Sequence, residues 1–100
     1  MAAYLIADIE VTDAAGYEEY RRIVGASIAA YGGHFIARGG KTATVEGNWM
    51  PKRVVIVEFA SMERLQAWYA SPEYAPALAL RKRSAVSNLV MTEGLQGSGG

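Results

Sequence analysis

Four ionisable residues alternate with apolar residues in short segments of the sequence. Asp8 and Glu58 each lie near the end of an apolar run, and His34 and Arg38 lie four residues apart in another. If these runs are strands, their side chains alternate between the two faces of a sheet, and the four groups share one face. Such a set can orient an anionic or carbonyl substrate and move a proton. We therefore predict His34 and Glu58 as catalytic candidates, and Arg38 and Asp8 as ligand-binding candidates.

Trp49 lies in a predicted loop, between Asn48 and Met50. A tryptophan in a loop typically packs over a pocket or against a partner, so Trp49 joins Arg38 and His34 in the predicted small-molecule site. If protonated His34 donates a hydrogen bond to a bound carboxylate, binding weakens as the pH rises through the titration of this histidine.

A purely structural role is an alternative for each of these residues. Buried charges need partners, so Arg38 is expected to form an ion pair with Glu58 or Asp8. His34 is the only histidine, and a single histidine is commonly just a partly buried polar residue. Asp8 also suits a charge that protects a sheet edge from aggregation.

The composition excludes several classes of protein. One hundred residues suffice for one domain, and ten Lys and Arg balance ten Asp and Glu, so we expect neither nucleic acid nor a membrane as partner. The absence of cysteine excludes a disulfide framework, a thiolate nucleophile and an iron–sulfur cluster. With one histidine there is no typical zinc site, and we expect no metal and no cofactor. The expected location is the cytoplasm.

Hydrophobic periodicity and turn residues predict four strands and three helices. The helix after Asp13 ends at Gly32-Gly33, and the segment from Lys41 to Val45 either extends the second strand or forms a short edge piece. A disordered tail is expected over residues 96–100. The strands are Tyr4–Val11, His34–Arg38, Arg53–Phe59 and Ser87–Glu93, and the later helices are Met62–Ala70 and Glu73–Ser84.

This order of elements predicts an α+β fold, the ferredoxin-like split βαβ with a four-stranded antiparallel sheet and helices on one face, in a single domain over residues 1–95. The other face would expose apolar side chains, and such a patch marks an association surface. Two copies packed sheet to sheet would cover it, so we predict a homodimer in which two subunits form a dimeric α/β barrel. The apolar residues of this face are Ile6, Ile36, Ile56 and Val90.

Several short motifs, in order, resemble the bacterial family known as domain of unknown function 1330, and the resemblance runs from about Tyr4 to Gly94. The motifs are Asp13–Tyr20, Tyr31-Gly32-Gly33, Arg38-Gly39-Gly40, Glu46–Trp49, Glu58-Phe59 and Ala67–Tyr74.

The resemblance implies the dimeric α/β-barrel superfamily, whose members include cofactor-independent monooxygenases, haem-degrading enzymes and lactone isomerases. It therefore implies no particular reaction. The recurrent polar positions of the family correspond to Tyr17, Tyr20, Arg38, Glu58, Trp68, Tyr69 and Tyr74. On this basis Tyr17 and Tyr20 are added to the ligand-binding candidates.

Two hypotheses about function follow. In the first, the chain is a small homodimeric domain that binds a small polar or anionic molecule in a pocket lined by sheet residues, with or without cofactor-independent catalysis. In the second, it is a non-catalytic structural or interaction dimer whose polar sheet residues only fix the dimer register.

Overall fold

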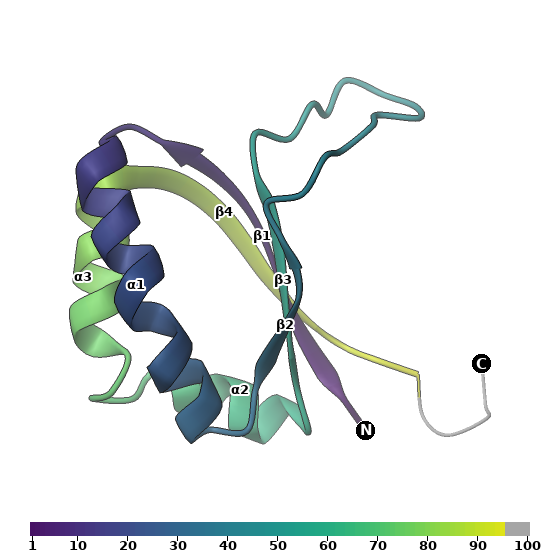
Figure 1. Ribbon diagram of the computed structural model, residues 1–100. Helices are drawn as coiled ribbons and strands as arrows, with labels where there is room; N and C mark the ends of the chain where they lie inside the picture. Colours follow the sequence, from purple (N-terminus) through teal and green to yellow (C-terminus); the bar gives the residue numbers. More distant parts are fainter. Residues whose placement is uncertain (96–100) are drawn as a thin grey trace.

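The chain forms a four-stranded antiparallel sheet with three helices on one face (Figure 1), which confirms the predicted ferredoxin-like fold. The computed structural model describes residues 1–95. The strand order is β2-β3-β1-β4. The elements are β1 (Ala3–Val11), α1 (Ala14–Ala30), β2 (His34–Arg38), β3 (Val54–Phe59), α2 (Met62–Tyr69), α3 (Ala75–Ser84) and β4 (Ala85–Glu93).

Residues at both ends of α1 explain where the helix begins and ends. The Asp13 carboxylate accepts a hydrogen bond from the backbone N–H of Gly16 at 3.3 Å, as an N-cap residue does. Beyond the last turn, Gly32 has a φ of +78°, which glycine adopts without strain. The buried side chains of the helix recur every three or four residues and face the sheet; they are Tyr17, Tyr20, Val24, Ser27 and Ile28.

The core lies between the helices and one face of the sheet. Phe59 and Val57 of β3 and Trp68 of α2 are each almost fully buried there. The Trp68 indole N–H donates a hydrogen bond to the Ser27 hydroxyl at 3.1 Å, so its one polar group is satisfied inside the core. Side chains of the opposite phase lie on the uncovered side of the sheet, called the open face below. It comprises Tyr4, Ile6, Asp8, His34, Ile36, Ile56, Glu58, Asn88, Val90 and Thr92.

A β-bulge in β2 changes the direction of one key side chain. His34 is paired with Glu58 on the open face, but the register shifts between Phe35 and Ala37, and Arg38 is paired with Val55. Val55 is buried on the helix-covered side, so the extra residue turns Arg38 to that side as well. The prediction that His34 and Arg38 share one face is therefore wrong.

Two element boundaries differ from expectation by two residues, and one loop also differs. The third helix begins at Ala75 rather than Glu73, because the Ser71 hydroxyl accepts the Tyr74 N–H in a turn before it. Strand β4 begins at Ala85, where it pairs with Val11 at the end of β1. Residues 39–53 form a loop that extends away from the sheet (Figure 1), with no strand over 41–45. The predicted tail, 96–100, lies outside the described residues. None of the helices within residues 1–95 is both long and apolar enough to cross a bilayer.

Candidate functional site

A small cavity lies between α1 and the sheet, on the helix-covered side. Its volume is about 20 Å³, about enough for one water molecule. Two tyrosines and three arginines line it together with the apolar residues Ile9, Val24, Phe35 and Val55. The tyrosines and arginines are Tyr17, Tyr20, Arg21, Arg38 and Arg53. We call this space, lined by these five residues, the arginine cavity below.

The arginine cavity adjoins a wider depression on the surface, with a volume of about 460 Å³. Arg21 and Arg38 line both spaces, so their side chains form the boundary between them. The remaining lining of the depression is Ala15, Glu18, Glu19 and Arg22 of α1.

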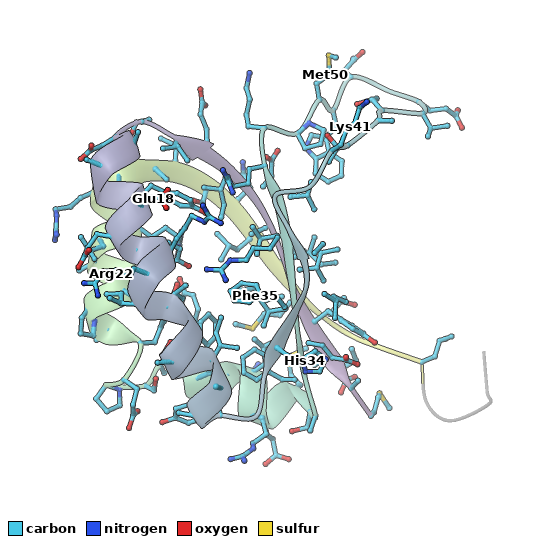
Figure 2. The ribbon with its side chains drawn as sticks, viewed as in Figure 1. Glu18, Arg22, His34, Phe35, Lys41 and Met50 are labelled. Atoms are coloured by element: carbon cyan, nitrogen blue, oxygen red, sulfur yellow. The ribbon has the colours of Figure 1, made fainter. Side chains whose placement is uncertain are left out.

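Arg38 is held in place by an aromatic ring and a carbonyl group. Its Cζ lies 4.0 Å from the centroid of the Phe35 ring, and its Nη2 donates a hydrogen bond to the backbone oxygen of Arg21 at 3.0 Å. Figure 2 shows Phe35 pointing from β2 toward α1. The expected ion pair of Arg38 with Glu58 or Asp8 is wrong, because the β-bulge places Arg38 on the other side of the sheet.

Arg53 immediately precedes β3, and sequence reasoning missed it as a site residue. Its Cζ lies 5.3 Å from the centroid of the Tyr17 ring, and its guanidinium group passes so close to Gly39 that a Cβ there would overlap it. Glycine at this position therefore gives the guanidinium its path into the cavity. Arg53 is in phase with Val55, Val57 and Phe59, and this phase alone could have placed it on the helix-covered side.

Arg21 was also missed, although it lies four residues after Tyr17 on the same face of α1. Its Nη1 is 3.5 Å from Glu18, but its Nε is buried and has no hydrogen-bond partner within residues 1–95. A buried donor without a protein partner is uncommon in folded proteins.

Four arginine charges act on the Tyr17 hydroxyl. Burial raises the pKa of the Tyr17 hydroxyl, while the charges of Arg53, Arg21, Arg38 and Arg81 act in the opposite direction. Arg81 of α3 is only 5% exposed, and its Nε donates to the Tyr74 hydroxyl at 3.4 Å. The pKa of Tyr20 is raised by burial and by the neighbouring Tyr74. In the described part of the chain, no carboxylate lines the arginine cavity.

On the open face, the two catalytic candidates contact each other. His34 Nε2 lies 2.9 Å from Glu58 Oε1, and the Tyr4 hydroxyl donates to Glu58 Oε2 at 3.2 Å. The Glu58 charge is the largest cause of a raised pKa at Tyr4. These three residues lie side by side on β2, β3 and β1, with both carboxylate oxygens occupied.

Asp8 and Trp49 form a second polar contact of the open face. The Trp49 indole N–H donates to Asp8 Oδ2 at 2.9 Å, and the backbone N–H groups of Lys52 and Arg53 donate to Oδ1. The Trp49 hydrogen bond is the largest cause of a lowered pKa at Asp8. Asp8 thus fastens the base of the 39–53 loop to the sheet, beside a depression of about 210 Å³.

The structure divides the predicted site residues between the two sides of the sheet. Arg38, Tyr17 and Tyr20 meet in the arginine cavity. His34 and Glu58 meet on the open face, as do Asp8 and Trp49. His34 and Arg38 therefore share no site within one subunit. Within residues 1–95, no three Asp, Glu or His side chains gather closely enough to hold a metal ion.

The fold and this cavity beneath α1 define a ferredoxin-like α+β domain with a small polar pocket between helix and sheet. The model of the family described as Domain of unknown function (DUF1330) matches residues 2–95, and the chain belongs to this family. A comparison with curated proteins gives no match.

Solved structures share the fold at low sequence identity. A protein of unknown function from Rhodopseudomonas palustris superposes with a TM-score of 0.76 at 20% identity, over 96% of this chain and 84% of that one. A protein from Jannaschia, described as dimeric and ferredoxin-like, gives 0.72 at 16% identity, over 94% and 100%. SnoaB, a cofactor-independent oxygenase from Streptomyces nogalater, gives 0.65 at 13% identity, over 97% and 96%.

Proposed function

We propose that this protein is a homodimeric domain that binds a small anionic molecule between α1 and the sheet. The observation that carries the proposal is the arginine cavity, where three guanidinium groups converge and no carboxylate of residues 1–95 takes part in the lining. Like charges that line one cavity repel one another, and a bound anion offsets this repulsion. Arginine also binds carboxylates through two parallel hydrogen bonds, which gives such a site geometric selectivity.

Arg38 has the position expected of the first ligand contact. Its guanidinium lies between the 460 Å³ depression and the inner cavity, and within residues 1–95 a single neutral carbonyl accepts a hydrogen bond from it. A carboxylate in the depression would replace that neutral acceptor by a charged one and can accept two parallel hydrogen bonds from the guanidinium. The Tyr17 hydroxyl also lines the inner cavity and can donate a hydrogen bond to a group that reaches it.

The open face suits a second copy of the chain. Ile36 and Val90 are 51% and 60% exposed there, and a sheet face with such side chains requires a cover. Its two polar contacts, Glu58 with His34 and Tyr4, and Asp8 with Trp49, are already satisfied, so they can be buried without a ligand. This favours a role for them in the register of the dimer, and the dimeric description of the Jannaschia protein agrees with it.

A thermal-shift comparison of charged and neutral ligands tests the proposal. Benzoate and benzamide have almost the same shape, and only benzoate carries a charge. At a hundred times its Kd, a ligand stabilises the folded state by about 2.7 kcal/mol, which raises the Tm of a domain of this size by about 10 °C or more. We expect carboxylates, at constant ionic strength, to raise the Tm, and their amides to leave it unchanged.

Arg21→Gln is expected to reduce the rise in Tm, because it removes the buried unpartnered Nε. Arg83→Gln, the same substitution at an exposed residue of α3, is the control and should leave it unchanged. Equal effects of acids and amides, or full retention of the shift in Arg21→Gln, would contradict the proposal.

A further inference from the structure

The arginines near the cavity differ in whether an acid neutralises them. Arg21 and Arg22 form ion pairs with Glu18 and Glu19 on the outer side of α1. Arg38, Arg53 and Arg81 form no ion pair with a carboxylate of residues 1–95. The charges of all three act on Tyr17. Two of them, Arg38 and Arg53, line the arginine cavity, so more than one positive charge there lacks a counter-charge from residues 1–95.

The two unpaired arginines that line the cavity are at different depths. Arg38 lines both the surface depression and the inner cavity, whereas Arg53 lines the inner cavity only. They also belong to different segments. Arg38 is the last residue of β2, and its guanidinium lies over the Phe35 ring. Arg53 immediately precedes β3, and its side chain passes Gly39 toward the Tyr17 ring. One group at the mouth and one inside can each meet a different part of the same ligand.

We propose that the ligand is a small dicarboxylate, with one carboxylate on Arg38 and the other on Arg53. The inference rests on the proposed function and adds to it the number and spacing of the negative charges. The inner cavity has room for about one water molecule while Arg38 lies over Phe35. Movement of Arg38 onto the first carboxylate joins the depression to the cavity, and the second carboxylate then reaches Arg53 and the Tyr17 hydroxyl.

The choice of two separate carboxylates over one phosphate follows from this spacing. A phosphate monoester places both charges on one group, which a single cluster of donors at one depth would hold. Here the donors lie on both sides of the boundary that Arg38 forms. Phe35 and Tyr17, next to the two guanidinium groups, provide apolar surface for the carbons between the carboxylates.

Calorimetric titration of the full chain with dicarboxylates from malonate to adipate, each beside its monomethyl ester, tests the inference. The ester keeps the length and removes one charge. We expect at least one dicarboxylate to bind about tenfold or more tightly than its monoester, since one charge-assisted hydrogen bond contributes that much. Inorganic phosphate, at the same ionic strength, should bind more weakly than this dicarboxylate.

Variants of Arg53 assign the second carboxylate. Arg53→Gln is expected to abolish the preference for the diacid and leave monoester binding unchanged, and Arg53→Lys is expected to retain part of it. Arg83→Gln is the control, and thermal melting of each variant shows whether it is folded. If Arg53→Gln does not fold, the Arg53→Lys variant carries the test.

The outcomes separate the two proposals. Equal affinity for diacid and monoester, or tighter binding of phosphate, overturns the dicarboxylate and leaves an anion site in place. An unchanged diacid preference in the folded Arg53 variants also overturns it. If no diacid, monoester or phosphate binds, both the dicarboxylate and the proposed function fail.

Discussion

The polar side chains on the two sides of the sheet differ in how their charges are matched. On the open face, the Glu58 carboxylate holds His34 and Tyr4, and Asp8 holds Trp49, so each of these acids has partners from this chain. On the helix-covered side, guanidinium groups gather without an acid in the lining of the described cavity. Polar groups that satisfy one another stabilise a surface, whereas groups of one sign that do not are suited to an external ligand. From this contrast we propose association on one side of the sheet and ligand binding on the other.

The largest effect, on the association of two subunits, is expected from a charge placed in the middle of the open face. Ile56 lies on β3 between the polar contacts, and an unpaired carboxylate buried there costs several kcal/mol. We predict that Ile56→Glu converts a dimer into a monomer in sedimentation experiments at micromolar concentration. Gln66→Glu, at an exposed residue of α2, is the control and should remain dimeric. A wild-type monomer at that concentration would remove the association role of this face.

A smaller effect, on carboxylate affinity, is expected to separate two substitutions on the same strand. Arg38 and His34 both belong to β2, but the β-bulge places them on opposite sides of the sheet. Arg38→Gln should weaken carboxylate binding by about tenfold to a hundredfold, as loss of a charged hydrogen bond does. His34→Gln should leave the affinity unchanged. Calorimetry measures the carboxylate affinity of both variants. Equal losses of affinity would show that the two residues serve one site.

The smallest effect is a pH dependence of stability at Asp8. Its pKa is lowered in the folded state, chiefly by the Trp49 hydrogen bond, so this contact stabilises the fold above the ordinary carboxyl pKa. That contribution disappears as the pH falls through the lowered pKa. Trp49→Phe should therefore reduce stability at neutral pH, and the difference from the wild type should shrink in acid.

Denaturant unfolding at several pH values measures this difference. In an Asp8→Asn background, Trp49→Phe should show no such pH dependence, because no titrating carboxylate remains. A difference that stays constant down to strongly acidic pH would show that Trp49 stabilises the loop by packing alone.

The sequence was sufficient to predict the element order and most of the two sheet faces, because alternation along β1 and β3 separates buried from open positions without any long-range information. It was not sufficient to predict the direction of Arg38, since one extra residue near Ile36 reverses every side chain after it and leaves no mark in the apolar pattern. Arg53 could have been found from its phase with Val55. The contact of Asp8 with Trp49 joins residues 41 positions apart and depends on a loop path that local patterns do not specify.

Chemical-shift mapping tests the division between the two sides most directly. The full chain, labelled with nitrogen-15, is titrated with a carboxylate that raises its Tm. We predict that the side-chain Nε–H signals of Arg38 and Arg53 and the backbone signal of Tyr17 shift on binding, while the Trp49 indole and the His34 backbone signals stay in place. Shifts confined to Trp49 and His34, with the arginine signals unmoved, would place the ligand on the open face and contradict the assignment of binding to the arginine cavity.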